Sequence, residues 1–345
     1  MLDKTYLKRI RFTKYANQLD LKIAVFHGNE IWVLRGLAID IEKSLKRIGV
    51  EVSRHEVNLN SPGAIPEADW FLFVQQGQLD AILGAWGYRK DLVKKSICIF
   101  THFVAKKCNF ELLSKIKLIS HMSSHQMAIS IGNGLSQENS KLMILGVDME
   151  RHYPITQDYL TNILNDLYPN IKIKQKRSYI GFCTRITNKS TYTNRKNYEC
   201  LLKVINKLVS SGENVLVIGD GWQNVKLAQR RDNLVIANPP YKHYNYFYNL
   251  MRLFVSVTSY DGGPIPLLES MACGVPAVIT NSGFAPDIIK NKNAGTIFQP
   301  FASESEVLNL IKESDKINYN REYLRRISSK YSFDEYAKKL INILS

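Results

Sequence analysis

Short apolar runs alternate with stretches of helical periodicity along most of the chain. LKIAVFHG, at residues 21–28, is continuously apolar, as a buried parallel strand requires, and apolar positions then recur near the helical period up to Gly49. Further runs of strand type in the first half are VEVSRHEV, DWFLFVQQG, SICIFTHF and IKLISHM. Strands that alternate with helices predict a parallel sheet covered by helices on both faces.

The same alternation restarts in the second half. Residues 151–177 lack a sheet pattern and contain Pro154 and Pro169, so we place the domain junction there. YIGFC, NVLVIGDG, LVIAN, FVSVTS and PAVITN are the strands expected beyond it, and KNYECLLKVINKLVSSG is the expected helix. The pattern predicts an α/β protein of two doubly wound, Rossmann-like domains, residues 1–170 and 171–325, that face a central cleft. The amphipathic end of the chain, residues 326–345, is expected to be helical.

Composition supports a folded, reduced protein. The 345 residues suit two domains, and 45% hydrophobic with 22% charged residues is a globular composition. The five cysteines include no C-x-x-C pair, so we expect reduced core residues. No apolar run is long enough to cross a bilayer, and the first residues lack the apolar core of a signal peptide. A cytoplasmic location is therefore expected.

The net charge of +15 predicts an anionic partner. Residues 172–196 hold eight basic residues and no acidic one, which fits either a solvated linker or a loop that faces phosphate. TYLKRIRFTKY, near the N-terminus, mixes basic with apolar side chains and suits an anionic membrane surface, although a disordered or strand-like leader fits equally well. Nucleic acid is not the expected partner, because aromatic residues do not interleave with the basic run.

The segment LFVSVTSYDGGPIPLLESMACGVPAVIT, at residues 253–280, has the order strand, glycine turn, short helix, strand. Gly262 and Gly263 allow backbone to approach a ligand, and Pro264 or Pro266 suits the first turn of a helix. A helix that begins at the edge of a parallel sheet attracts phosphate through its free N–H groups and its dipole. An anion site is therefore expected at the start of this helix.

Two carboxylates accompany this expected anion site. The Cα–Cβ bond of a helical residue tilts toward the N-terminus, so Glu269 should aim its carboxylate back at the helix start, beside Asp261. Carboxylates repel phosphate but accept hydrogen bonds from sugar hydroxyls, and a sugar nucleotide presents both kinds of group. The alternative is an ordinary helix on which Glu269 faces solvent.

The segment D-G-G-P-I-P-L-L-E-S-M-A-C-G-V-P resembles the E-x7-E signature of retaining GT-B glycosyltransferases, in particular their large fourth sequence family. Asp261 and Glu269 stand at its two acidic positions. KLMILGVDMERHYP resembles the segment that ends the family's first domain, and YIGFCTR, RKNYECLLKVINKL and VIGDG resemble parts of its second. The resemblance implies a GT-B fold whose C-terminal helix, residues 326–345, packs back toward the N-terminal domain.

The resemblance also implies roles for single residues. An arginine and a lysine clasp the donor's diphosphate in that family, which implies Arg185 and Lys196 here. The first acid and the backbone beside it hold the sugar, which implies Asp261, and a histidine over the sugar implies His102. The leaving phosphate, held also by the Ile265 amide, would accept the acceptor's proton on the same face of the sugar.

The second acid of the signature bonds the ribose hydroxyls in that family, which implies this role for Glu269. The donor-binding residues implied in full are Glu269, Gly262, Gly263, Pro264, Ile265, Pro266, Leu267 and Gly219. On the acceptor side the resemblance implies Gly28 and Asn29.

The chain departs from the family pattern in four places. Near the N-terminus, where relatives often have a glycine pair, HGNEIWVLRG offers only Gly28 in its place. Asp261 replaces the usual glutamate and reaches one methylene less far, and Pro264 removes a backbone donor where many members have glycine. The separation of Arg185 and Lys196 is long, which leaves Lys189 or Arg195 as alternative partners of the diphosphate.

Neither a metal nor another cofactor is expected. His121 and His125 have the i, i+4 spacing of a zinc-binding helix, but the glutamate between them and a third ligand are missing. The chain has no D-x-D triplet to hold a divalent ion on a diphosphate. Arg185, Lys196 and the helix dipole are expected to neutralise that charge.

The sequence therefore predicts a retaining glycosyltransferase that uses a UDP- or GDP-linked sugar and acts on a saccharide or lipid-linked acceptor. Its expected setting is cell-surface polysaccharide or glycolipid synthesis, at the inner face of the cell membrane. One alternative is a sugar-nucleotide 2-epimerase of the same fold, although its acid–base carboxylates are not visible in the sequence. The other is a protein that binds or glycosylates nucleic acid.

Overall fold

The computed structural model describes residues 20–28, 33–57, 63–101, 108–171, 177–187, 194–222, 225, 227 and 232–345. Within them the chain forms two six-stranded sheets, of order β2-β1-β3-β4-β5-β6 and β12-β11-β10-β7-β8-β9. All strand pairs whose register is described are parallel. This confirms the α/β class with two parallel sheets.

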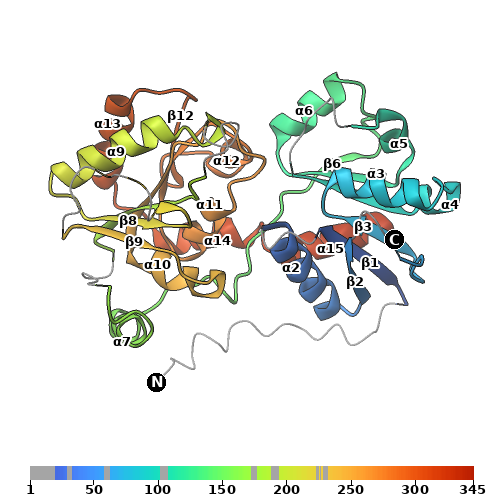
Figure 1. Cartoon of the computed structure of the whole chain (residues 1–345), viewed down its shortest axis with the longest axis horizontal. Coiled ribbons are helices and arrows are strands. Elements are labelled where there is room, and N and C mark those ends of the chain that lie inside the picture. The colour runs from blue at the N-terminus through green and yellow to red at the C-terminus, as the bar shows by residue number, and fades with distance from the viewer. Residues whose placement is uncertain are drawn as a thin grey trace. The chain divides into compact units, whose positions relative to one another are not determined.

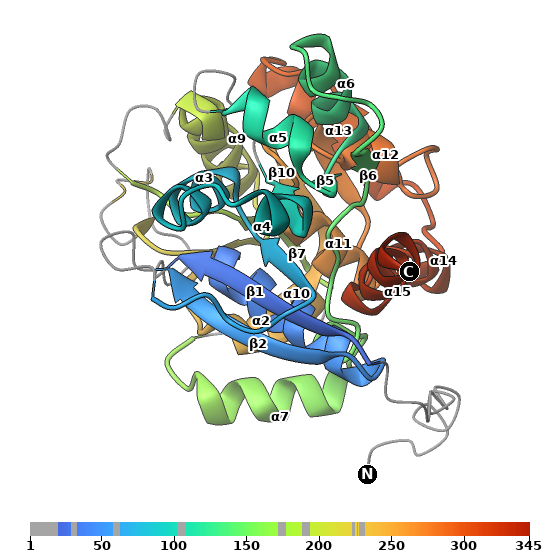
Figure 2. The ribbon, with the colours of Figure 1, turned by 90° about the vertical axis from the view of Figure 1, so that its right-hand side faces the viewer.

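The first sheet follows the predicted apolar runs closely. Its elements are β1 (Lys22–Gly28), α2 (Val33–Arg47), β2 (Glu51–Val57), β3 (Trp70–Phe73), α3 (Gln76–Ala85), α4 (Lys90–Lys94), β4 (Ser96–Phe100), α5 (Phe110–Lys115), β5 (Leu118–His121), α6 (Ser124–Gly132) and β6 (Ser140–Leu142). Helix α2 packs on β1 and β2, while α3 packs on β1 and β3 (Figure 2). Strand β6 was not predicted, because two of its three residues are exposed and it has no apolar run.

Helix α7 (Gln157–Leu167) lies in the segment where the sequence shows no sheet pattern. Leu160 and Leu164, one turn apart, are its buried side chains, and the helix ends just before Pro169. A single apolar stripe on an otherwise polar helix explains why the segment reads as a polar linker.

The second sheet carries the segment with the candidate chemistry. Its elements are β7 (Tyr179–Cys183), α9 (Tyr198–Ser210), β8 (Val215–Ile218), β9 (Leu234–Ala237), the 3-10 helix η3 (Tyr241–His243), α10 (Tyr244–Leu250), β10 (Met251–Ser256), α11 (Ile265–Ala272), β11 (Ala277–Thr280), α12 (Ala285–Ile288), β12 (Gly295–Phe298) and α13 (Glu304–Asp315). Helices α9 and α13 cover one face of this sheet, and α10 and α11 cover the other (Figure 1). Val217 and Val255 of the sheet pack with Val204 of α9 in the buried core on the first of these faces.

The strand order of the second sheet reverses between β7 and β10. The chain runs outward through β8 and β9 on one side of β7, then returns to build β10, β11 and β12 on the other side. In open parallel sheets, ligands bind outside the carboxyl ends of the strands at such a reversal. The loops that follow β7 and β10 are therefore the place to look for a site.

The end of the chain forms two helices, α14 (Arg321–Ser329) and α15 (Phe333–Leu344), where one amphipathic helix was expected. Ser332 caps the second helix, since its Oγ accepts a hydrogen bond from the Glu335 amide at 3.2 Å. Val147 holds the break between the helices, because its amide donates to the Tyr331 carbonyl at 3.1 Å. A Cβ atom on Gly146 would lie 1.8 Å from that same carbonyl oxygen, so this close contact requires glycine.

The chain divides into two compact units. One comprises residues 1–99, 108–119 and 337–345, and the other comprises residues 100–107 and 120–336. The predicted domain boundary near residue 170 stays a prediction. Among the described residues, no helix combines the length and apolar character needed to cross a membrane.

Candidate functional site

The loops that follow β7 and β10 are joined at the reversal of the second sheet. The amide of Ser259, beyond β10, donates to the carbonyl of Arg195 at 3.0 Å. Arg195 belongs to the segment between β7 and α9, which also contains Arg185. The structure therefore brings together segments that the sequence singled out separately.

Lys196 and Asp261 form an ion pair across these two loops. The distance from Lys196 Nζ to Asp261 Oδ2 is 2.8 Å, and the two side chains are only 15% and 13% exposed. The second oxygen of this carboxylate, Oδ1, accepts a hydrogen bond from the Gly263 amide at 3.2 Å. A cation and an oriented carboxylate thus lie side by side, as a site for phosphate and sugar groups would require.

The start of α11 offers fewer amide donors than the sequence implied. The Ile265 amide, expected to hold the leaving phosphate, donates instead to the Gly263 carbonyl at 2.9 Å. The Leu267 amide likewise donates to the Pro264 carbonyl at 2.8 Å. Pro264 and Pro266 have no N–H group. An anion at this helix would therefore depend on the dipole and on side-chain cations more than on these amides.

Gly283 shapes the loop before α11 from the neighbouring segment. Its φ angle of +54° and a Cβ position only 2.9 Å from the Asp261 carbonyl oxygen and the Pro264 ring require glycine. Gly262 is buried and Gly263 is half-buried in the loop itself. Gly283 therefore packs tightly against the loop that carries Asp261.

Gly219 has a packing role in this structure. A Cβ atom at Gly219 would lie 2.1 Å from the Thr184 carbonyl oxygen, just beyond β7. That carbonyl also accepts a hydrogen bond from Trp222 Nε1 at 2.7 Å. The Tyr198 hydroxyl donates to the carbonyl of Arg185, whose side chain is half-buried. Gly219 therefore helps to fix the backbone beside Arg185.

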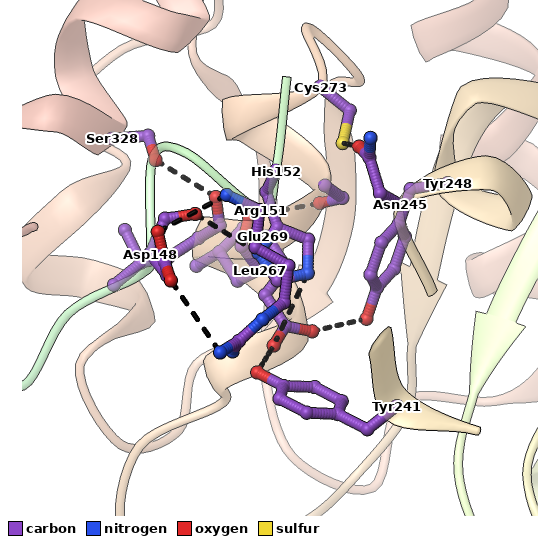
Figure 3. A network of polar contacts seen from close by, with 12 residues as sticks. Asp148, Arg151, His152, Tyr241, Asn245, Tyr248, Leu267, Glu269, Cys273 and Ser328 are labelled. Carbon is purple, nitrogen blue, oxygen red and sulfur yellow. Dashed lines mark hydrogen bonds and ion pairs between the residues drawn. The ribbon is translucent and has the colours of Figure 1, made fainter. Parts of the chain in front are cut away.

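Glu269 is more enclosed than the sequence suggested. Its side chain is 2% exposed, and each carboxylate oxygen accepts a hydrogen bond from a tyrosine. The Tyr248 hydroxyl donates to Oε2 at 2.7 Å, and the Tyr241 hydroxyl donates to Oε1 (Figure 3). Glu269 therefore neither faces solvent nor lies open at the helix start.

His152 and Arg151 complete the surroundings of Glu269. His152 Nε2 lies 3.8 Å from Glu269 Oε1, and the ring is fully buried. The Arg151 guanidinium lies 5.0 Å from the centre of the Tyr241 ring and 3.5 Å from Asp148 Oδ2 (Figure 3). A cation thus lies over the aromatic side chain that covers Glu269.

Burial keeps the groups around Glu269 neutral. Burial raises the pKa of the Tyr248 phenol well above its ordinary value, and the neighbouring Cys183 and Glu269 add to this effect. Burial also raises the pKa of the Cys183 thiol to about 12. The pKa of His152 is lowered, because burial outweighs the opposite effect of Glu269. Near neutral pH, Tyr248 and Cys183 therefore keep their protons and His152 is uncharged.

Three of the expected site residues, His102, Asn29 and the alternative Lys189, lie outside the described residues. Gly28 is the last residue of β1, at the carboxyl end of the first sheet. Of the two candidate alternatives to Lys196, Arg195 is described, and its backbone carbonyl joins the two loops.

His121 and His125, whose i, i+4 spacing is that of a zinc-binding helix, do not lie on one helix. His121 ends β5, whereas His125 lies in α6. His121 is fully buried, its Nε2 lies 3.3 Å from Ser140 Oγ, and burial lowers its pKa to about 4. Among the described residues, no three His, Cys, Asp or Glu side chains gather where they could hold a metal ion.

Tyr241, Tyr248 and His152 were not singled out from the sequence. PPYKHYNYFYN, which follows β9, is dense in aromatic residues and follows the carboxyl end of a strand. That placement was a usable signal for the tyrosines. His152 lies in HYP, in the segment expected to join the domains, where nothing marks it as a partner of Glu269.

The segment that contains this site is similar to known proteins. Residues 184–330, which contain Lys196, Asp261, Tyr241 and Glu269, match the family described as glycosyl transferases group 1. A probable sucrose-phosphate synthase of Thermosipho melanesiensis is 21% identical over 44% of this chain and 38% of its own length. The O-antigen chain mannosyltransferase B of Escherichia coli is 32% identical over 23% of this chain and 20% of its own length. The chain thus spans well under half of each of these relatives.

Solved structures share the whole fold. HepE of Anabaena, in complex with UDP and glucose, matches 94% of this chain and 99% of its own with a TM-score of 0.68 and 13% identity. A glycosyltransferase from Rickettsia africae matches 94% and 97% with a TM-score of 0.69 and 15% identity. Residues 184–330 therefore match glycosyl transferases group 1, and the chain has the GT-B fold of two Rossmann-like domains.

Proposed function

We propose that the protein is a retaining glycosyltransferase that moves a sugar from a nucleotide-diphosphate sugar to a hydroxyl of a saccharide or lipid-linked acceptor. The observation that carries this proposal is the Lys196–Asp261 pair at the reversal of the second sheet. It sets a cation for the diphosphate beside a carboxylate for sugar hydroxyls, inside the segment that matches the family. The UDP and glucose bound by HepE support a UDP-linked donor.

The proposed roles follow from charge and position. Lys196 and Arg185 hold the diphosphate, Asp261 with the backbone of Gly262 and Gly263 holds the sugar, and Glu269 accepts hydrogen bonds from the ribose. His102, outside the described residues, is proposed to lie over the sugar. Neither a metal nor another cofactor is part of the proposal.

The proposed reaction breaks the bond between the anomeric carbon and the phosphate oxygen and forms a bond to the acceptor oxygen on the same face. The proton of the acceptor hydroxyl passes to the departing phosphate, which serves as the base. Lys196 and Arg185 then stabilise the negative charge that develops on the leaving diphosphate. Catalysis by this route needs no strongly basic side chain.

The acceptor and the setting belong to the same proposal. The net charge of +15 favours work at an anionic membrane surface, where lipid-linked acceptors are found. The O-antigen mannosyltransferase among the relatives supports a setting in cell-surface polysaccharide or glycolipid synthesis. We therefore place the enzyme on the cytoplasmic side of the cell membrane.

The test begins with the donor. Thermal shift with UDP-, GDP- and ADP-sugars should show stabilisation by at least one donor, because a ligand that binds only the folded state raises the melting temperature. Transfer from that donor to candidate acceptors is then followed by the NMR signal of the product's anomeric proton. Retained configuration supports the proposal. An inverted product, an epimer formed from the donor alone, or no stabilisation by any donor would each refute it.

A further inference from the structure

The two oxygens of the Glu269 carboxylate have partners of different kinds. Oε2 is held by Tyr248, which is fully buried in α10. Oε1 is held by Tyr241, which is 42% exposed and lies in the three-residue turn η3 after Pro240. Tyr248 is therefore enclosed by the core, whereas Tyr241 lies partly at the surface.

His152 presents a second acceptor to the same place. Its Nδ1 lies 3.3 Å from the Asp148 carbonyl oxygen, which puts the ring proton on Nδ1 and leaves Nε2 as an acceptor. Nε2 makes no hydrogen bond to any described group, although the ring is fully buried and lies 3.8 Å from Glu269 Oε1. Burial lowers the pKa of His152, so protonation does not supply the missing donor near neutral pH.

His152 Nε2 is a buried acceptor without a donor, and it faces Glu269 Oε1, whose donor comes from the partly exposed Tyr241. Leaving a buried polar atom without a hydrogen bond destabilises the fold by about 1–3 kcal/mol, so such an atom points to a function. An anion would be repelled by Glu269, and no third metal ligand lies among the described residues. Two hydroxyl groups on neighbouring carbons supply one donor for each acceptor at the right spacing.

We propose that Glu269 Oε1 and His152 Nε2 together accept the two hydroxyls of a cis-vicinal diol, and that this diol displaces the Tyr241 hydroxyl. The inference rests on the proposed function, in which the diol is the ribose of the nucleotide donor. It adds His152 as a binding residue and makes Tyr241 a removable cover of the site.

Arg151 stabilises the covered form. Its guanidinium lies over the Tyr241 ring at 5.0 Å and is itself anchored by Asp148 at 3.5 Å. A nucleotide must therefore replace a hydrogen bond and a cation–π contact before its ribose reaches Glu269. A ribose with both hydroxyls compensates this loss, whereas a ribose that lacks one of them compensates only part of it. The site should consequently select ribonucleotides over deoxyribonucleotides.

The experiment compares UDP, 2′-deoxy-UDP and 3′-deoxy-UDP by calorimetry, with the corresponding guanosine and adenosine nucleotides as further sets. In the native protein each missing hydroxyl should weaken binding by about tenfold or more, as expected for a hydrogen bond to a buried acceptor. Failure of UDP, GDP and ADP all to bind would refute the proposed function. Binding without any preference for the complete diol would refute this inference and the ribose role of Glu269, but not the proposed sugar transfer.

Two substitutions of His152 separate the new role from a structural one. His152→Asn keeps a polar group near the Asp148 carbonyl but removes the acceptor at the Nε2 position. One of the two deoxy-UDP nucleotides should therefore bind this variant as tightly as UDP does, so that one of the two deoxy penalties, the losses of affinity relative to UDP, vanishes. His152→Gln places an amide oxygen near the Nε2 position and should restore that penalty. Both penalties at their native size in His152→Asn would overturn the inference.

Tyr241→Phe tests whether the diol displaces the Tyr241 hydroxyl from Glu269. It tests the inference even if the His152 variants do not fold. The change removes the competing hydroxyl from an exposed side chain, so UDP should bind several-fold more tightly than to the native protein. Tyr246→Phe, a change in the following helix at a residue that does not contact Glu269, is the control and should leave the affinity unchanged. Unchanged or weaker UDP binding by Tyr241→Phe would contradict displacement of its hydroxyl.

Discussion

Lys196 and Asp261 neutralise each other in this structure, and the donor should change that balance. A diphosphate that takes Lys196 replaces one carboxylate by phosphate oxygens, which are comparable charged acceptors. Asp261 stays oriented by the Gly263 amide, at 3.2 Å from Oδ1, and can then accept hydrogen bonds from sugar hydroxyls. Lys196 and Asp261 therefore satisfy each other's charge until the donor offers each of them another partner.

Lys196→Met should weaken donor binding by about ten- to a hundredfold, because it removes a charge-assisted hydrogen bond to the diphosphate. It should also lower the free energy of unfolding by about 2 kcal/mol, since Asp261 would stay mostly buried without its charged partner. Calorimetry with UDP and denaturant unfolding measure the two effects.

The matched control for this substitution is Lys203→Met. Lys203 forms an ion pair with Glu199 on the exposed surface of α9, at 2.7 Å, where pairs contribute little. Native donor affinity in Lys196→Met would show that another cation, such as Arg185 or Arg195, holds the diphosphate.

Sequence reasoning located the acids of the site better than their partners. Asp261 and Glu269 could be found because a glycine turn and a helix start mark their segment. The hydroxyls on Glu269 come from η3 and α10, 28 and 21 residues earlier in the chain. The cation of Asp261 lies 65 residues away, although the resemblance had already singled out Lys196 for the diphosphate. Contacts over such separations depend on tertiary packing, which periodicity does not encode.

Among the elements, α14 holds α11 in place. Arg325 Nη1 donates to the Ala272 carbonyl at the end of α11, at 2.8 Å, and to the His152 carbonyl at 2.9 Å. Ser328 Oγ donates to the Leu268 carbonyl at 2.9 Å. One arginine thus ties the helix of Glu269 to the segment of His152 and places a positive charge at a helix C-terminus.

Arg325→Met should lower the free energy of unfolding by about 2–3 kcal/mol, because it leaves carbonyl groups of α11 and of the His152 segment without their charged donor. It should also weaken nucleotide binding, since Glu269 and His152 would no longer be held together. Denaturant midpoints and UDP affinity are the measurements.

Arg326→Met, one position further along the same helix, is the control for this prediction. The Arg326 side chain is exposed and lies 5.6 Å from the centre of the Tyr323 ring, so its loss should change stability by less than about 0.5 kcal/mol. Equal effects of the two substitutions would mean that Arg325 contributes only as a surface charge.

Elements with a long apolar pattern were predictable, and short or interrupted ones were not. The runs that predicted β1, β4, β8 and β10 are buried over most of their length. Strand β12 alternates less clearly, with two of its four residues half-buried. The break between α14 and α15 depends on the cap at Ser332 and on Val147, a distant partner. The hydrophobic periodicity continues across such a break and therefore does not reveal it.

The net charge acts at the scale of the whole molecule. The chain has 46 Lys+Arg and 31 Asp+Glu, and this excess attracts anionic surfaces without any specific contact. Each basic residue near an anionic membrane contributes about 1 kcal/mol, and the attraction decays over about 8 Å at physiological ionic strength. A general charge effect and a dedicated anchoring segment predict different responses to substitution.

The native protein should sediment with vesicles of phosphatidylcholine and phosphatidylglycerol at low salt, but not with phosphatidylcholine alone. Because screening shortens the range of the attraction to about 3 Å near 1 M salt, binding should be lost as salt is raised. Absence of binding to the anionic vesicles at low salt would contradict the proposed membrane contact.

Two variants that lose the same number of positive charges show which part of the chain binds the anionic vesicles. One replaces by glutamine the basic residues of the N-terminal segment, which are Lys4, Lys8, Arg9, Arg11 and Lys14. The other replaces the same number of basic residues in the first half of the chain, namely Lys90, Lys94, Lys95, Lys115 and Lys117. Because TYLKRIRFTKY also has apolar side chains that can enter the interface, the first variant should lose more binding than the second. Equal losses would assign the attraction to net charge alone.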